Sequence, residues 1–281
     1  MAATKSVKLL TAACLAEFLA MLLFVVFACG TAMGIDGNRA SQTSSGGTGD
    51  SSETGMTSKL PSWIIMLSLA FGLTITVLVY STAHISGGHV NCAVTWGLVL
   101  TGNCPIIEGV AYFFSQMLGS LCGAFILLAI YPASMDMTKG VGSNGLAEGW
   151  YTGNALLGEI MGTFLLMMAV LQTACNPDSA SIRAQAPVAI GFAVFMAHAV
   201  LLPIDGCSIN PTRSFGPAVA AKIRYGGESE AFKSMWIFWV GPIIGASLAA
   251  LVYKVFRALA DTPATGKGQL EENEVADQAT V

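Results

Sequence analysis

Two short stretches decide the fold: residues 85–101, ISGGHVNCAVTWGLVLT, and residues 205–222, DGCSINPTRSFGPAVAAK. In each, a small polar turn leads to an asparagine and then to a short run of helix-forming sequence. Asparagine is a strong helix N-cap, and Pro211 suits the first turn of a helix. The runs, 91–101 and 210–222, would form helices of roughly 15 Å at 1.5 Å per residue, about half of a ~30 Å bilayer core. We therefore predict two half-helices that enter a membrane from opposite sides and meet near its centre.

The composition is that of a membrane protein. Of the 281 residues, 54% are hydrophobic and only 11% are charged, whereas a soluble domain carries about 25% charged residues. Residues 60–107 include no Lys, Arg, Asp or Glu. A membrane-spanning helix needs about 20 apolar residues. The pattern predicts an all-α membrane protein with spans near 9–33, 62–83, 107–131, 154–175, 184–204 and 235–257.

The parts outside the spans are polar. We expect an N-terminal segment at 1–8, one channel domain at 9–257 with a flexible Ser-, Thr- and Gly-rich loop at 36–59, and an acidic tail at 258–281. The first apolar block is too long for a cleaved signal peptide. The seven cysteines lie mostly in apolar blocks and are not spaced as a disulfide framework or metal site. No basic patch indicates a nucleic-acid partner, and we expect no cofactor.

The two halves of the chain repeat one another. Aligning Asn91 with Asn210 places residues 70–72 on residues 189–191 and sets Glu17 opposite Glu159. The repeats run from about 9 to 131 and from about 154 to 257. Three spans in each half is an odd number, so the second repeat must be inverted. Inverted repeats with broken helices place the functional site at the bilayer midplane.

Several long motifs resemble those of the aquaporins, or major intrinsic proteins. They are AEFLAMLLFVVFACG, SLAFGLTITVLVYSTAHISGGHVNCAVTWG, GCSINPTRSFGPA and WIFWVGPIIGASLAALVY. The resemblance covers about residues 9–257 and is strongest to the water-selective subgroup. It implies six tilted helices and two half-helices, a homotetramer with one pore per subunit, and water as the permeant.

The paired Asn-Pro-Ala boxes of that family are altered in this sequence. They read Asn91-Cys92-Ala93 and Asn210-Pro211-Thr212. Both asparagines remain, and each side-chain amide can donate a hydrogen bond to water while a positive helix end lies behind it. Taken singly, each asparagine could be an ordinary N-cap, but their matched positions favour a pore.

Four residues are implied by the resemblance to form the narrowest ring, the selectivity filter. They are Phe71, His198, Cys207 and Arg213. An arginine inside an apolar region must face water or a partner, although it could also extend to the surface. His198 and Phe71 could instead be ordinary core residues. In the ring, we expect arginine and histidine to supply donors and phenylalanine to close the other side, which suits water and excludes glycerol. Cys207, and Cys92 near the centre, are expected targets of mercurials.

The two intramembrane acids, Glu17 and Glu159, are costly unless they are hydrogen-bonded. They could relay protons in a transporter. The resemblance instead implies that they support the re-entrant loops, with help from Gln116. Loop carbonyls would then form a ladder of acceptors for single-file water, and they belong to Gly87, Gly88, His89, Val90, Gly206, Cys207, Ser208 and Ile209.

The leading interpretation is a passive water channel in a lipid bilayer, without catalytic chemistry. The alternatives are a broader pore that also passes glycerol, hydrogen peroxide or ammonia, a secondary transporter, and a structural junction protein. A membrane enzyme is least favoured because no metal cluster, nucleophile–base pair or phosphate loop is visible. Lys and Arg are evenly divided between the two sides, so the positive-inside rule gives no orientation. We expect both termini to be cytoplasmic and the membrane to be the plasma membrane, with an intracellular membrane as the alternative.

Overall fold

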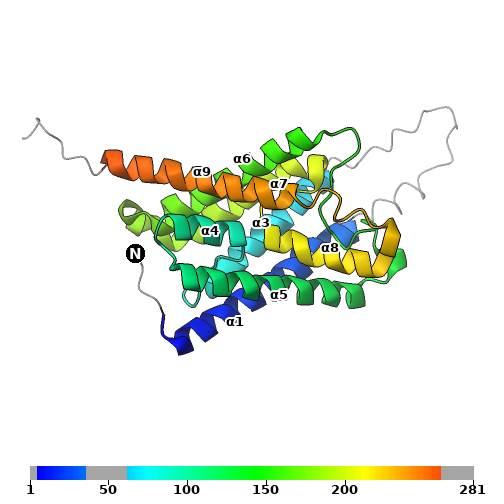
Figure 1. Cartoon of the computed structure of the whole chain (residues 1–281), viewed down its shortest axis with the longest axis horizontal. Coiled ribbons are helices and arrows are strands. Elements are labelled where there is room, and N and C mark those ends of the chain that lie inside the picture. The colour runs from blue at the N-terminus through cyan, green and yellow to red at the C-terminus, as the bar shows by residue number, and fades with distance from the viewer. Residues whose placement is uncertain (1–4, 36–61, 261–281) are drawn as a thin grey trace, which may run out of the picture.

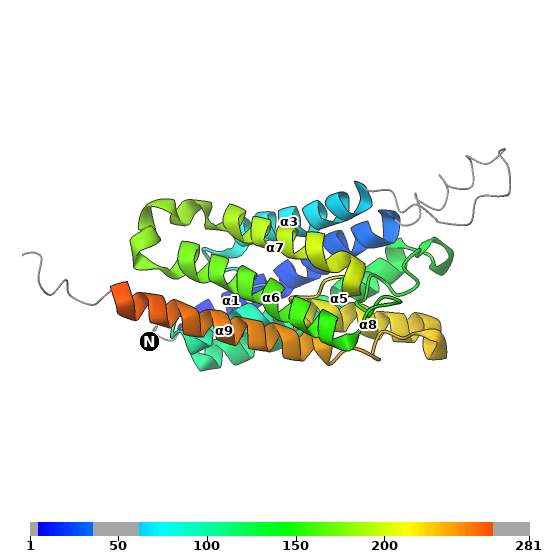
Figure 2. The same cartoon turned by 90° about the horizontal axis from the view of Figure 1, so that it is seen from above.

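The computed structural model describes residues 5–35 and 62–260. The predicted flexible loop at 36–59 and nearly all of the predicted acidic tail lie outside the described residues. Within them the secondary structure is helical, and six helices are long and apolar enough to cross a membrane. These helices run along the long axis of the molecule (Figure 1). The start of the first and the end of the last lie at the same end of the bundle in both views (Figure 2), as an even number of spans requires.

The six spans match the predicted ranges to within a few residues. The first comprises α1 (Val7–Phe24) and its continuation to Ile35. The others are α3 (Ser62–Thr82), α5 (Ile106–Ile130), α6 (Thr152–Val170), α7 (Ala186–Asp205) and α9 (Ile237–Ala260). Helix α9 extends three residues beyond the predicted end of the channel domain. Short 3₁₀ helices are η2 (Ala133–Met135), η4 (Pro177–Gln185) and η5 (Gly226–Glu228).

The two half-helices form as predicted. Helix α4 (Cys92–Leu100) follows Asn91, and α8 (Pro211–Tyr225) follows Asn210. They lie toward opposite ends of the bundle (Figure 1). Helix α8 is longer than expected because its last turn continues past Lys222 to Tyr225.

Glycines allow the helices of the two repeats to approach closely. A Cβ added at Gly72 of α3 would lie 2.6 Å from the carbonyl oxygen of Gly191 of α7, and the reverse distance is also 2.6 Å. These two glycines occupy equivalent positions in the aligned repeats. Small residues at such crossings let membrane helices pack backbone to backbone. The α3–α7 contact therefore joins the repeats along a pseudo-symmetry axis.

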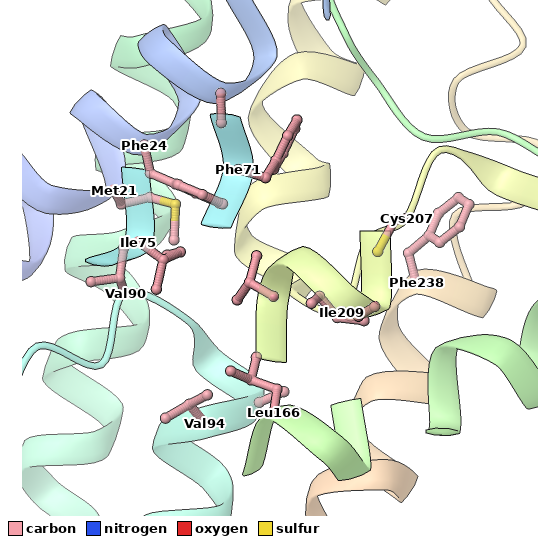
Figure 3. Close-up of a cluster of buried hydrophobic side chains, with 14 of the residues drawn as sticks. Met21, Phe24, Phe71, Ile75, Val90, Val94, Leu166, Cys207, Ile209 and Phe238 are labelled. Atoms are coloured by element: carbon pink, nitrogen blue, oxygen red, sulfur yellow. The ribbon is translucent and has the colours of Figure 1, made fainter. Parts of the chain in front are cut away.

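Both repeats contain a π-helical turn in their first span. It is η1 (Val25–Cys29) after α1 and η3 (Leu171–Cys175) after α6. π-Helical turns widen a helix locally and often occur at functional sites. Inside the bundle, a cluster of buried apolar side chains surrounds the half-helices, including Phe24, Leu166 and Phe238 (Figure 3).

Candidate functional site

The two asparagines cap the half-helices. Asn91 has extended backbone geometry (φ −164°), and its side-chain oxygen accepts a 2.8 Å hydrogen bond from the N–H of Ala93. Asn210 has φ −155°, and its oxygen accepts from the N–H of Arg213 at 3.2 Å. Each side-chain oxygen is thus committed to its own helix, which orients the NH₂ group away from that helix.

The asparagine amides cross-link the two repeats. Asn91 Nδ2 donates to the carbonyl of Ile209 at 2.7 Å, and Asn210 Nδ2 donates to the carbonyl of Val90 at 2.8 Å. The two half-helix N-termini therefore face each other at the middle of the chain's fold. An amide NH₂ has two donors, so each asparagine retains one N–H for a passing molecule.

The two loops before these asparagines follow the same backbone path. In the first loop φ is positive at Gly87 (99°), Gly88 (64°) and Val90 (50°). In the second loop it is positive at the equivalent residues: Gly206 (81°), Cys207 (52°) and Ile209 (45°). Positive φ is uncommon for a β-branched residue, and such strain clusters at functional sites. The match shows that the repeat extends to individual backbone angles.

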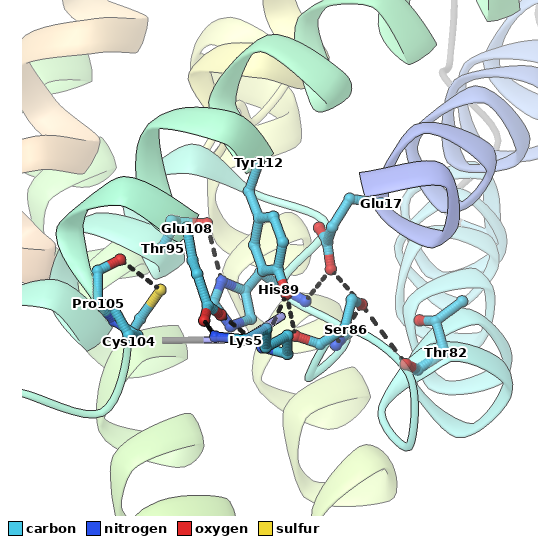
Figure 4. A network of polar contacts seen from close by, with 11 residues as sticks. Lys5, Glu17, Thr82, Ser86, His89, Thr95, Cys104, Pro105, Glu108 and Tyr112 are labelled. Carbon is cyan, nitrogen blue, oxygen red and sulfur yellow. Dashed lines mark hydrogen bonds and ion pairs between the residues drawn. The ribbon is translucent and has the colours of Figure 1, made fainter. Parts of the chain in front are cut away.

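Glu17 holds the first loop (Figure 4). One carboxylate oxygen accepts from the hydroxyl of Ser86 (2.6 Å) and the N–H of His89 (2.9 Å). The other accepts from the N–H of Val90 and from Gln116 Nε2, both at 2.8 Å. Glu17 and Gln116 are fully buried, and Gln116 contacts the loop through Glu17.

Glu159 holds the second loop. Its two oxygens accept from the N–H groups of Ser208 and Ile209, both at 2.6 Å. Asp205, at the end of α7, accepts from the N–H of Cys207 at 2.9 Å. Asp205 was not predicted as a site residue, although an acid directly after the uncharged block 184–204 was a usable signal.

Three of the four predicted ring residues come together. Phe71 and His198 are stacked with ring centroids 4.2 Å apart, and the Arg213 guanidinium lies 5.2 Å from the Phe71 ring centroid. Phe24, which was not predicted as a site residue, packs edge-on against Phe71 at 5.7 Å. Cys207 is fully buried.

The hydrogen bonds of the ring define its chemistry. His198 Nδ1 donates to the carbonyl of Val194 at 2.8 Å, because a carbonyl can only accept. A neutral His198 therefore presents an acceptor at Nε2, where the sequence led us to expect a donor. Arg213 Nη1 donates to the carbonyl of Gly142 at 2.9 Å. Among the described residues, His198 Nε2 and Arg213 Nε have no hydrogen-bond partner.

Two cavities approach the ring from opposite ends. The larger, about 570 Å³, is lined by both asparagines, by Val94 and by His198. The smaller, about 130 Å³, is lined by Phe71, Arg213 and residues of the loop around Gly142. Cys207 does not line either of these two cavities, although its chain neighbours Gly206 and Ser208 do.

Most of the residues whose carbonyls were predicted to face the pore line one of the two cavities. Gly87, Gly88, His89, Ser208 and Ile209 line the larger cavity, and Gly206 lines the smaller one. The carbonyls of Val90 and Ile209 already accept one hydrogen bond each from an asparagine.

The hydroxyl of Thr212 donates to the side-chain oxygen of Asn210 at 2.7 Å. No cluster of three or more metal-ligating side chains occurs among the described residues.

The sequence profile described as "Major intrinsic protein" matches residues 3–253. The chain belongs to the major intrinsic protein family. It is accordingly an integral, multi-pass membrane protein of the aquaporin class, with six spanning helices and two re-entrant half-helices.

Alignments with other proteins cover most of this major intrinsic protein. Aquaporin PIP2-1 of Arabidopsis thaliana is 41% identical over 250 residues, which cover 88% of this chain and 81% of that protein. Aquaporin-1 of Ovis aries is 36% identical over 271 residues, which cover 94% and 91% of the two chains. The X-ray structure of the aquaglyceroporin from Plasmodium falciparum superposes with a TM-score of 0.73 at 20% identity, covering 90% of this chain and 99% of that one. At that identity the superposition supports the fold alone.

Proposed function

We propose that this protein is a passive channel that conducts water in single file and excludes protons, ions and glycerol. The observation that carries the proposal is the meeting of two capped half-helix N-termini at the wall of the larger cavity. The positive ends of α4 and α8 repel cations at the centre. The remaining N–H of Asn91 and of Asn210 orients each water oxygen inward, which interrupts a proton wire.

The ring supplies the size limit. Phe71 and His198 close one part of the passage, and Arg213 adds a fixed positive charge and donors. A water molecule exchanges its hydrogen bonds for those of Arg213 Nε and His198 Nε2, whereas glycerol is too large to pass. No chemical bond changes in this process, so the proposed activity is transport without catalysis.

The buried acids favour a channel over a proton-coupled transporter. Both oxygens of Glu17 and of Glu159 accept hydrogen bonds from loop donors. Each oxygen of Glu17 accepts two hydrogen bonds, so a proton added to Glu17 would replace one of them. This supports their role as structural acceptors for the loops.

We also propose a homotetramer in the plasma membrane with both termini on the cytoplasmic side. The spans expose large apolar side chains outward, such as Leu15, Phe114 and Leu165, which suits contact with lipid or with neighbouring subunits. Mass measurement of the detergent-extracted protein tests the tetramer, and protease accessibility of tagged termini in intact cells tests the orientation.

Purified protein in liposomes tests the channel itself. We expect fast osmotic shrinkage, no glycerol uptake and no dependence on a proton gradient. Slow shrinkage together with gradient-driven solute uptake would show that the protein is a transporter. A mercurial should block water flow in the wild type, and loss of that block in Cys207→Ser but not in Cys92→Ser would assign the reactive thiol.

A further inference from the structure

A single buried carboxylate organises the loop that faces the ring. Asp136 is 3% exposed, and its oxygens accept four hydrogen bonds. Two come from Thr138 (N–H at 3.2 Å, hydroxyl at 2.6 Å), one from the N–H of Val141 at 2.9 Å, and one from the hydroxyl of Tyr225 at 2.7 Å. The last bond matters most, because Tyr225 is the final residue of α8, the half-helix that carries Arg213 near its start.

The loop presses Gly142 against the π-helical turn η1. The backbone adopts positive φ at Val141 (55°) and Gly142 (69°). The hydroxyl of Thr138 accepts from the N–H of Gly142 at 3.0 Å. A Cβ at Gly142 would lie only 2.9 Å from Cys29 Cβ and 3.1 Å from the carbonyl oxygen of Cys29. Only glycine fits here without displacing η1, so the direction of the Gly142 carbonyl is tightly fixed.

That carbonyl is the acceptor for Arg213. It receives Arg213 Nη1 at 2.9 Å, whereas Arg213 Nε has no partner among the described residues. Two residues further along the loop, Asn144 accepts from the hydroxyl of Ser214 at 2.7 Å. The loop thus contacts α8 at its first turn, through Gly142 and Asn144, and at its last residue, through Asp136.

We propose that Asp136, together with Tyr225, is a positioning residue that fixes Arg213 and thereby sets which solutes the ring excludes. The inference rests on the proposed function, since solute exclusion has meaning only for a conducting channel. Loss of the Asp136 charge frees the turn at 138–142, the Gly142 carbonyl moves, and Arg213 loses its acceptor. The ring then becomes less selective while the passage for water remains.

The test compares wild type, Asp136→Asn and Tyr225→Phe in liposomes at matched protein content, measuring water, glycerol and urea permeability. Glu148→Gln, an exposed acid later in the same loop, is the matched control. We expect the solute-to-water permeability ratio to rise about threefold to tenfold in Asp136→Asn, the size of coupling between neighbouring groups. Tyr225→Phe should show a smaller rise, and Glu148→Gln should show none. Tyr225→Phe removes a single hydroxyl and carries the test should Asp136→Asn fail to fold.

A double variant separates positioning from general destabilisation. In an Arg213→Ala background, Asp136→Asn should raise the ratio no further, because its effect passes through Arg213. An equal rise in that background, or unchanged exclusion in both Asp136→Asn and Tyr225→Phe, overturns the inference. A wild-type protein without water conduction would instead overturn the proposed function.

Discussion

The two re-entrant loops share one backbone path but are held in different ways. Glu17 receives four hydrogen bonds, two of them from the side chains of Ser86 and Gln116. Glu159 receives two, both from the backbone, and Asp205 at the end of α7 accepts a third from the N–H of Cys207. Both loops are therefore held by an acid on the first span of their own half, and the second loop has an additional acceptor at the end of α7, the helix that leads into it. The repeat preserves loop geometry more strictly than the contacts that stabilise it.

The two halves differ most in what they present to the passage. Position 94 in the first half is equivalent to position 213 in the second, three residues after each asparagine. Val94 lines the larger cavity, and Arg213 lines the smaller one. A charged side chain occurs at only one of these two equivalent places. Under the proposed function, solutes are therefore selected at one end of the passage, although the centre of the fold is symmetric.

The largest expected effect comes from removing the acids. Glu17→Ala removes the acceptor of four hydrogen bonds, and Glu159→Ala removes the acceptor of two. Each unsatisfied buried group costs about 1–3 kcal/mol, so both variants should lose folded protein and Glu17→Ala should lose more. Thermal unfolding of the detergent-solubilised protein, followed by size-exclusion chromatography, measures this. Greater damage from Glu159→Ala would show that the second loop has less independent support than its contacts indicate.

Making the second half resemble the first should abolish the size limit. Arg213→Val places the first-half residue in the ring, which we expect to raise glycerol permeability by about tenfold, equivalent to a barrier lowered by ~1.4 kcal/mol. Val94→Ala is the matched control and should leave glycerol excluded. Stopped-flow uptake in liposomes gives both values, and continued exclusion by Arg213→Val would remove Arg213 from the ring.

A polar network connects Lys5, near the N-terminus, to α5 and to the first re-entrant loop. The backbone N–H of Lys5 and its ammonium both bind the buried carboxylate of Glu108, and the ammonium also donates to Tyr112, whose hydroxyl donates to the carbonyl of Ser86 (Figure 4). The pKa of Lys5 is raised, because the hydrogen bonds to Glu108 and Tyr112 outweigh the opposing effect of burial.

Lys5→Ala should lower the melting temperature by several degrees, at ~2–4 °C for each kcal/mol lost. A raised folded-state pKa means that the stabilisation is complete below the ordinary lysine value of 10.5. It is lost as pH rises through the folded-state pKa. The difference between wild type and Lys5→Ala should therefore persist at pH 7 and shrink above pH 10.5. The exposed Lys8→Ala serves as control, and a difference that did not change with pH would exclude the ion pair as its cause.

The smallest expected effect concerns the altered motif. Thr212 donates to Asn210, whereas the equivalent Ala93 has no hydroxyl. Thr212→Ala should cost about 1 kcal/mol, the net value of one hydrogen bond, and leave solute exclusion intact. Thr212→Ser should behave as wild type in the same melting assay. A gain of glycerol permeability in Thr212→Ala would show that this hydroxyl narrows the centre.

Much of this fold could be predicted from sequence, because apolar block length, N-cap residues and the repeated spacing are local signals. The half-helices follow from such signals, whereas the role of Glu17 and Glu159 at the loops was implied only by the family resemblance. The Gly142 carbonyl could not be predicted: it is a backbone atom in an irregular loop, 71 positions from the arginine that it binds. The Nδ1 bond of His198 and the burial of Cys207 depend in the same way on packing that no spacing records.

The crossed amide bonds at the centre also constrain how the chain matures. While only the first repeat has been synthesised, the Asn91 amide and the Val90 carbonyl lack the partners that residues 209 and 210 later provide. Unsatisfied backbone groups in hydrocarbon cost several kcal/mol. We therefore expect these two hydrogen bonds to form only after the second half-helix has been inserted, so that the centre of the passage is completed last.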